Sequence, residues 1–147
     1  TLGQYIFGAL AHESHAELHN WYEQQRDYYR EMIYELHKGF KEVEPDFIIS
    51  NPEASIYFVI DVRNVAKPGF DGVEFAAWCA EHGRVTLDDG NDYTLLMAPL
   101  NGFYSGLNGD NNPGKTQLRV SFCENPELLK LAPVLLSKLF RAYEAQR

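Results

Sequence analysis

The sequence predicts an α+β fold in two layers, with helices covering one side of a mostly antiparallel sheet. Three observations favour this class. A long apolar stripe at helical spacing opens the chain, short apolar runs joined by turn residues follow as in β-hairpins, and two further helical patterns come between and after them. Because 147 residues suit one domain, we expect residues 1–147 to form a single domain with its own core.

The first helix is predicted over residues 10–38, because apolar side chains recur there at spacings of three and four. The stripe comprises Leu18, Trp21, Tyr22, Tyr29, Met32, Ile33, Leu36 and Phe40. Gly39 stands where the residue after a helix end is expected, so the helix should stop there. A face this wide and aromatic should pack against something large.

Strands are predicted over residues 46–50, 55–62, 85–87, 93–97 and 117–122, which are rich in β-branched and aromatic residues. An Asn-Pro-Glu turn joins the first two runs and indicates an antiparallel hairpin. An Asp-Gly step between the third and fourth runs indicates a second hairpin over residues 84–99.

Two more helices are predicted from their end signals. The middle helix should span residues 73–82, with Asp71 as its N-cap and Gly83 as its end. The last helix should start at Asn125-Pro126, an N-cap followed by proline at the first helical position. Pro133 lies inside that last pattern and should kink the helix or split off a short first turn.

Charge and composition exclude several classes of function. The net charge is −8, from 13 basic and 21 acidic residues, without a dense basic cluster. A nucleic-acid partner needs such a cluster, and an acidic membrane surface would repel the chain, so neither is expected as a partner. We find no signal peptide and no apolar membrane-spanning run, which predicts the cytoplasm. Cys79 and Cys123 lie in apolar stretches and should be buried reduced thiols.

His12, His15 and His19 lie at helical spacing on the first predicted helix, where three imidazoles could share one face and bind Zn²⁺. No cysteine lies nearby and no fourth ligand follows at metal spacing. A solvated helix start therefore explains them better, and we predict no metal site. Serine-hydrolase elbows and glycine-rich phosphate loops of known pattern are missing from the sequence.

Arg119 is the strongest candidate for a binding residue. It lies at the centre of the apolar run Leu118-Arg119-Val120-Ser121-Phe122, where a buried charge needs a partner. Its planar guanidinium suits a carboxylate, which it can hold with two parallel hydrogen bonds. From composition alone, a structural ion pair or an edge strand with the side chain in water explains Arg119 better than a ligand site does. The Gly/Asn-rich stretch over residues 100–115 is typical of a functional or mobile loop.

Several motifs together resemble class I/II, fold-type I, pyridoxal-phosphate-dependent aminotransferases, and their order and spacing agree over nearly the whole chain. The opening helix is similar to the one that follows the cofactor lysine segment in that family. The matching segments are Pro52-Glu53-Ala54-Ser55-Ile56-Tyr57-Phe58, Glu74-Phe75-Ala76-Ala77-Trp78, His82-Gly83-Arg84-Val85, Ala98-Pro99-Leu100-Asn101-Gly102-Phe103-Tyr104 and Leu118-Arg119-Val120-Ser121-Phe122.

The resemblance implies that the chain is the C-terminal small domain of a larger aminotransferase. It implies that Arg119 binds the α-carboxylate of the amino-acid substrate, and that Asn101, Gly102, Phe103 and Tyr104 line the substrate side. The catalytic lysine and the residues that bind pyridoxal 5′-phosphate would lie upstream, so this chain alone should bind no cofactor and be inactive. The implied partners are an L-amino acid, a 2-oxo acid, the chain's own N-terminal large domain and a second subunit in a homodimer.

The sequence departs from the family pattern in two places. Ala54 and Ser55 stand where Gly and Ala are usual, and the stretch between Tyr104 and Leu118 is longer than in many members. Three alternatives stay open: a decarboxylase or lyase on the same scaffold, a non-enzymatic module that binds a partner through its aromatic helix face, and a metal-binding module.

Overall fold

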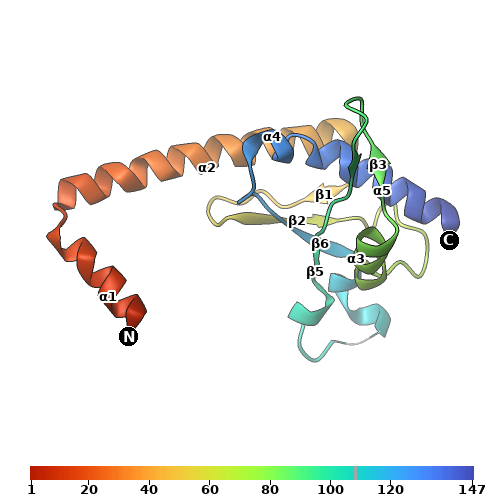
Figure 1. The fold of residues 1–147 in the computed structure, drawn as a ribbon. Helices are drawn as coiled ribbons and strands as arrows, with labels where there is room; N and C mark the ends of the chain where they lie inside the picture. Colours follow the sequence, from red (N-terminus) through yellow and green to blue (C-terminus); the bar gives the residue numbers. More distant parts are fainter. Residues whose placement is uncertain (108) are drawn as a thin grey trace. The chain divides into compact units, whose positions relative to one another are not determined.

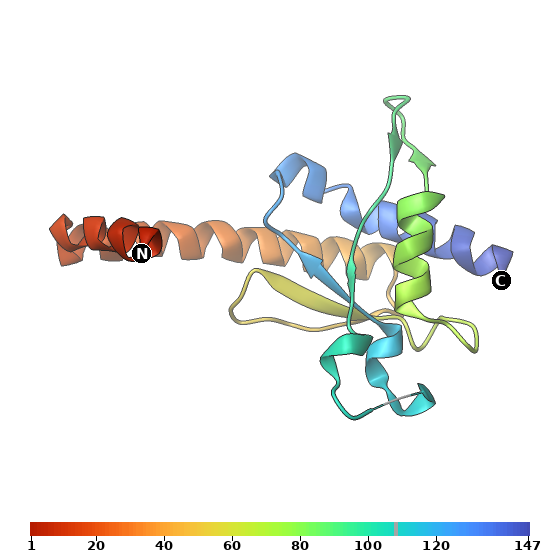
Figure 2. The same ribbon diagram turned by 60° about the horizontal axis from the view of Figure 1, so that its bottom comes forward.

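The computed structural model describes residues 1–107 and 109–147, which form two compact units, Thr1–Met32 and Ile33–Arg147. The helices are α1 (Leu2–Ala9), α2 (His15–Val43), α3 (Gly72–Glu81), α4 (Pro126–Leu129) and α5 (Ala132–Gln146), with 3₁₀ turns η1 (Leu10–His12), η2 (Asn101–Phe103), η3 (Gly109–Asn111) and η4 (Pro113–Thr116). The strands are β1 (Ile48–Ile49), β2 (Tyr57–Asp61), β3 (Val85–Thr86), β4 (Asp92–Tyr93), β5 (Ala98–Pro99) and β6 (Gln117–Ser121). Figure 1 and Figure 2 show this order along the chain.

The start of the long helix is corrected from residue 10 to His15. Ser14 and Glu17 form a reciprocal cap, in which the Glu17 amide donates to Ser14 Oγ at 3.2 Å and the Ser14 amide donates to Glu17 Oε2 at 3.0 Å. This capping box satisfies backbone donors that would otherwise lack partners, and so fixes where the helix begins. Before it, α1 is a separate helix that the sequence analysis missed, and it buries none of its side chains.

The end of α2 is corrected as well, because the helix continues through Gly39 to Val43. Leu36 and Phe40 on this part of the helix are almost fully buried. A Cβ atom added to Gly39 would lie 3.0 Å from Cγ of Pro133 in α5. Gly39 therefore allows two helices to approach closely and does not end a helix. Glycine is typical of both situations, so the residue type alone does not decide between them.

The main sheet has the strand order β1-β2-β6-β5, with every neighbouring pair antiparallel. The first predicted hairpin is confirmed, since Ile48 pairs with Asp61 and Ile49 with Ile60. The second is shorter than predicted, because β3 and β4 pair only over two residues each and form their own small sheet. The predicted strand over residues 93–97 was too long, and β5 beyond it joins the main sheet.

One face of the main sheet is buried and the other is open. Phe58 and Ile60 of β2 and Leu118 and Val120 of β6 point into the core, at alternate positions along each strand. Phe40 of α2 meets Phe58 edge-on, at 5.7 Å between ring centroids. The predicted α+β class, with helices on one side of an antiparallel sheet, is thus confirmed (Figure 2).

The helices α3 and α5 pack together within this layer. The N-caps predicted for the middle helix and for the start of the last helical pattern are confirmed, in α3 and in α4. Asp71 accepts a hydrogen bond from the Val73 amide at 2.8 Å, and Asn125 accepts one from the Glu127 amide at 2.9 Å. Pro133 lies in the first turn of α5, so the last helical pattern is split into α4 and α5. The split follows because proline lacks the amide that a continuous helix would need.

The two cysteines differ, against the prediction that both are buried. Cys79 is buried in α3, and burial raises the pKa of its thiol to about 12. Cys123 is exposed just after β6. The apolar neighbours of Cys123 suggested a core position, but strand alternation turns Phe122 inward and Cys123 outward.

Candidate functional site: a guanidinium on the open face of the sheet

Arg119 lies at the middle of β6 on the open face of the main sheet. Its neighbours along the strand, Leu118 and Val120, are buried on the other face. Arg119 pairs with Val59 of β2 on one side and with Ala98 of β5 on the other. Two ladders therefore fix the backbone of this residue, which gives its side chain a rigid base.

The guanidinium of Arg119 is held by aromatic rings. Its Cζ lies 4.9 Å from the centroid of the Tyr57 ring and 5.5 Å from that of Phe103. Among the side chains that the structure describes, no carboxylate forms an ion pair with Arg119. Cation–π contacts orient a guanidinium without using its N–H donors, so these donors remain free for an anion.

The turn over residues 101–104 lies beside this guanidinium. Phe103, whose side chain is 63% exposed, reaches Arg119 from η2. Tyr104 follows it, and its hydroxyl donates to Oε1 of Gln117 at 2.5 Å. Gln117 precedes Arg119 by two positions on β6, so both side chains lie on the same face of the sheet.

The polar loop that follows is tied back to this turn. Nδ2 of Asn112 donates to the carbonyl oxygens of Asn101, at 2.8 Å, and of Leu107, at 3.1 Å. Oδ1 of Asn112 accepts from the Gly114 amide at 2.9 Å. One side chain thus holds three backbone groups of the loop and supports the turn next to Arg119.

A buried carboxylate, Asp61, lies behind the turn. It is only 4% exposed and accepts hydrogen bonds from Thr116 Oγ1 at 2.7 Å, from Gln117 Nε2 at 3.1 Å and from Arg63 Nε at 2.7 Å. Burial raises the pKa of its carboxyl group, but these donors outweigh burial and hold the pKa below its ordinary value. Asp61 is therefore a fixed anion that orients Gln117, and through it Tyr104.

A groove of about 390 Å³ runs along the same open face. It is lined by Ile48, Ser50, Val59, Asp61, Arg63, Tyr104 and Gln117. Val59 lies directly opposite Arg119 in the β2–β6 ladder, so the groove neighbours the strand position of Arg119. An anion bound at Arg119 would have this groove beside it.

The structure brings together some of the predicted site residues. Phe103 contacts Arg119, and Tyr104 reaches Arg119's strand through Gln117. Asn101 and Gly102 instead line a second hollow, of about 420 Å³, which shares Tyr104 with the groove. Sequence reasoning missed Tyr57, Asp61 and Gln117. A signal existed for Asp61, because an acidic residue within the apolar run of β2 needs buried partners for the same reason as Arg119.

The three histidines do not share a helical face, against the geometry that a metal module would need. His12 lies in η1, whereas His15 begins α2 and His19 follows in it. Among the side chains that the structure describes in residues 1–107 and 109–147, no group of three or more from histidine, cysteine, aspartate or glutamate is placed to hold a metal ion. Within those same residues, no helix combines the length and apolar character that a membrane crossing requires.

The residues that line the groove beside Arg119 do not fit pyridoxal phosphate, which needs a lysine to hold it. Lys41 donates to the Phe47 carbonyl at 2.8 Å, Lys67 contacts the Glu144 carbonyl, and Lys130 pairs with Glu127 at 2.7 Å. The groove beside Arg119 has no lysine among its lining residues. No step through this cofactor is therefore derived from the residues of this chain.

Comparison with solved structures shows that the chain shares its fold with parts of aminotransferases. An archaeal alanine:glyoxylate aminotransferase aligns with a TM-score of 0.58 at 21% identity, over 78% of this chain and 24% of its own. A proposed amino-acid aminotransferase from Psychrobacter arcticum aligns with a TM-score of 0.61 at 14% identity, over 82% of this chain and 25% of its own. A proposed kynurenine aminotransferase from Saccharomyces cerevisiae, Bna3p, aligns with a TM-score of 0.62 at 17% identity, over 86% and 29%.

The chain thus spans about a quarter of the length of these structures, and has the fold of a small domain of such enzymes. No family model matches the sequence, and no curated protein matches it. The similarity is therefore one of fold, and the function has to be argued from the site.

Proposed function

We propose that this chain is the substrate-binding small domain of a pyridoxal-phosphate-dependent aminotransferase, in which Arg119 holds the α-carboxylate of an amino acid or a 2-oxo acid. The observation that carries the proposal is the state of the Arg119 guanidinium. It is fixed by β6 and by the rings of Tyr57 and Phe103, and among the described side chains it has no carboxylate partner.

Arg119 would act by binding and orientation. A guanidinium and a carboxylate form two parallel charge-assisted hydrogen bonds, which fix the direction of the substrate as well as its position. The aromatic rings reduce the freedom of the side chain before the substrate arrives, so less conformational entropy is lost on binding. An oriented substrate has its reacting bond aligned with groups elsewhere in the protein.

The turn over residues 101–104 would shield the bound carboxylate from water. Phe103 is exposed and lies on the guanidinium, so the apolar ring would cover the ion pair. An ion pair gains strength when water is excluded from it. Tyr104 would hold this turn in place through its hydrogen bond to Gln117.

The remaining parts of the proposed enzyme lie outside these residues. The cofactor, when bound, supplies an electron sink for amino-group transfer, and its lysine and phosphate-binding residues would belong to a large domain. A homodimer in the cytoplasm, formed mainly through that domain, is part of the same proposal.

The proposal is tested with Arg119→Ala in the longest polypeptide that the reading frame encodes. Losing a desolvated guanidinium–carboxylate pair costs about 2–5 kcal/mol, so kcat/KM for transamination should fall roughly 30- to 5,000-fold. The absorbance of the bound cofactor should stay unchanged, because Arg119 would touch the substrate alone. Steady-state kinetics and an absorbance spectrum measure both quantities.

Arg30→Ala is the matched control, since Arg30 is 72% exposed and pairs only with Asp27 at 2.7 Å among the described residues. It should leave kcat/KM unchanged. Wild-type kinetics in Arg119→Ala would refute the assigned role. Release of CO₂ or of a fragment of the amino acid, in place of a 2-oxo acid, would show a decarboxylase or a lyase on the same scaffold.

A further inference from the structure

Asn101 and Gly102 are neighbours at the start of the turn η2, whose Phe103 contacts Arg119. The Gly102 amide donates to Oδ1 of Asn101 at 3.0 Å. Asparagine side chains commonly bond to nearby backbone groups, because the short side chain keeps its carboxamide within reach of them. In this turn the carboxamide of Asn101 and the backbone nitrogen of Gly102 therefore lie next to each other, and these two groups can react.

The backbone nitrogen of Gly102 is accessible to such a reaction. Gly102 is exposed, and a Cβ atom added to it would meet nothing within 4 Å, so its surroundings leave room for the nitrogen to move. Amides at the start of a helical turn have no backbone acceptor within that turn, so the contact with Oδ1 can be exchanged without breaking η2. Both residues line the hollow of about 420 Å³, which is wide enough to admit water.

We propose that Asn101 is a modification site, at which the chain deamidates without an enzyme. Asparagine is a thermolabile residue type, and a following glycine shields its own nitrogen least. A base in water removes the amide proton of Gly102, and the nitrogen attacks Cγ of Asn101. The new N–Cγ bond closes a succinimide ring, the Cγ–Nδ2 bond breaks, and Nδ2 leaves as ammonia with a proton from water.

Water then opens the succinimide ring at either of its carbonyl carbons. Opening at Cγ gives aspartate at position 101. Opening at the main-chain carbonyl carbon gives isoaspartate, in which the main chain runs through Cβ and Cγ and is longer by a methylene group. In sum, a water molecule converts the carboxamide of Asn101 into a carboxylate and ammonia is released, so the step consumes no oxidant and no reductant.

The products would disturb the turn that contacts Arg119. Phe103 is the second residue after Asn101, and its ring centroid lies 5.5 Å from Cζ of Arg119. Arg119 itself is fixed in β6 by ladders on both sides. A longer main chain at position 101 therefore moves the ring relative to a guanidinium that stays in place, and each product adds a negative charge to the turn. The chemistry does not depend on the proposed function, whereas the resulting loss of substrate binding rests on it.

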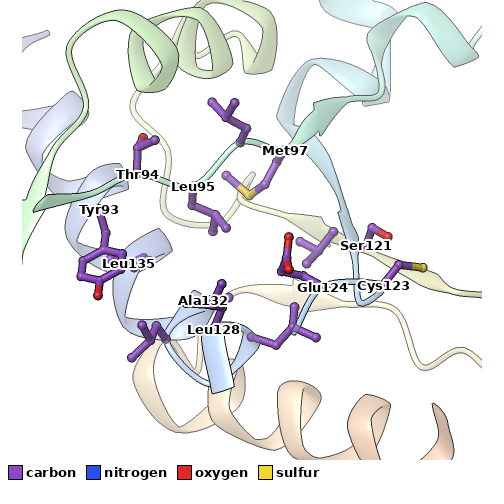
Figure 3. A pocket seen from close by; sticks show the side chains of 14 residues that line it. Tyr93, Thr94, Leu95, Met97, Ser121, Cys123, Glu124, Leu128, Ala132 and Leu135 are labelled. Atoms are coloured by element: carbon purple, nitrogen blue, oxygen red, sulfur yellow. The ribbon is translucent and has the colours of Figure 1, made fainter. Parts of the chain in front are cut away.

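Other asparagines of the chain serve as internal references. Asn112 and Asn125 precede prolines, whose nitrogens carry no proton to lose, so neither can close the ring. Asn112 belongs to the same loop, and Asn125 caps α4 beside Glu124, which Figure 3 shows among the residues that line an apolar cavity of about 500 Å³. Asn108 also precedes a glycine and lies outside the described residues, so the measurement must distinguish a change at Asn101 from one at Asn108.

The test is peptide mapping by mass spectrometry of the longest polypeptide that the reading frame encodes, kept folded at physiological temperature and at several pH values. We expect the fragment spectra to show loss of the amide at Asn101, with aspartate and isoaspartate products that separate chromatographically. The rate should rise in proportion to the hydroxide concentration, because the attack needs the deprotonated nitrogen. Asn112 and Asn125 should keep their amides throughout.

Gly102→Ala tests the geometry of the attack. The added methyl group meets nothing within 4 Å, so the variant should fold. The same methyl group hinders the approach of the nitrogen to Cγ, so loss of the Asn101 amide should be severalfold slower. In the unaltered polypeptide, kcat/KM for transamination should fall as the converted fraction rises.

Two results would contradict the proposed modification. The Asn101 amide could be lost only after urea unfolds the chain, or it could be lost equally fast in Gly102→Ala, and either result would mean that the folded turn does not promote the attack. Full conversion at Asn101 with unchanged kcat/KM would refute its effect on Arg119. Conversion in a polypeptide that transfers no amino group would support the modification and refute the proposed function.

Discussion

Asp61 shows how a single residue can organise the open face of the sheet. Its carboxylate accepts from Thr116, Gln117 and Arg63 while it is almost fully buried. A buried charge is tolerated only when its lone pairs are satisfied, and here the donors come from three separate positions. Removing the charge would leave several donors facing one another behind the turn that carries Tyr104.

Stability should fall in acid because of Asp61. The pKa of Asp61 in the folded protein is below the ordinary value of 3.8. Its contribution to the free energy of unfolding is therefore complete above that pH, and it is lost as the pH falls through the folded pKa. We expect Asp61→Asn to lower the free energy of unfolding at pH 7 by about 1.5–3 kcal/mol, since an amide nitrogen would face existing donors. Below pH 3.8, the free energy of unfolding of the variant should also fall less steeply with decreasing pH than that of the unaltered chain. Urea unfolding at several pH values measures both effects.

Asp27→Asn is the control for this experiment, because Asp27 pairs with Arg30 at the surface and is 69% exposed. Its effect should stay within about 0.5 kcal/mol at every pH. An acid limb in Asp61→Asn as steep as that of the unaltered chain would mean that another carboxylate governs acid unfolding.

The sequence predicted Arg119 as a binding residue and, through the resemblance, Phe103 beside it. It missed Tyr57 and Gln117 for one physical reason. A charge within an apolar run is visible in the sequence, whereas a ring that contacts it from another strand is not. Tyr57 comes from β2 and Phe103 from η2, and only the β2–β6 ladder and the turn after β5 bring them to Arg119. Gln117 gave no signal because an amide is common on any open strand face.

At the scale of helices and strands, capping residues predicted most ends correctly. Asp71, Asn125 and Pro133 act as their local chemistry requires. Gly39 misled because glycine serves both as a helix end and as a point of close contact, and only the position of Pro133 decides between them. Local sequence signals therefore predict where a helix begins or ends when the capping residue acts within that helix. They fail when the residue type is required by contact with an element far away in the sequence.

Gly114 is a second glycine that a distant element requires. A Cβ atom at this position would lie 2.5 Å from the Leu100 carbonyl oxygen and 2.7 Å from Cα of Asn101. Both are backbone atoms at the start of η2, so they cannot turn away as a side chain could. We expect Gly114→Ala to displace the turn over residues 101–104 and to cost about 1–3 kcal/mol of stability, measured by urea unfolding.

Gly102 offers the matched control within the same turn. A Cβ atom there would meet nothing within 4 Å, so Gly102→Ala should change stability by less than about 0.5 kcal/mol. If both variants were equally stable, the loop over residues 109–116 would not support the turn as the packing indicates.

At the scale of the whole molecule, the pattern of apolar and polar residues predicted the fold class but not the order of the strands in the sheet. Alternation in β2 and β6 marks each as a strand with one buried face. Their pairing joins residues about sixty positions apart, such as Tyr57 with Ser121, and no local signal states it. The same holds for β5. Its two residues follow the β3–β4 hairpin in sequence, but they belong to the main sheet because their partners, Arg119 and Leu118, are in β6.

The division of the chain into two compact units makes a prediction at this scale. The buried hydrophobic residues lie within Ile33–Arg147, with Met32 at its edge. Their aromatic contacts join α3 to α5, as in Phe75 with Phe140, and α2 to β2, as in Phe40 with Phe58. A unit with a contiguous core of this kind should unfold in a single transition. We therefore expect residues 33–147, expressed alone, to give coincident urea transitions by far-UV circular dichroism and by tryptophan fluorescence, since Trp78 packs on Phe75 and Tyr143. Transitions that separate would mean that the core requires residues 1–32.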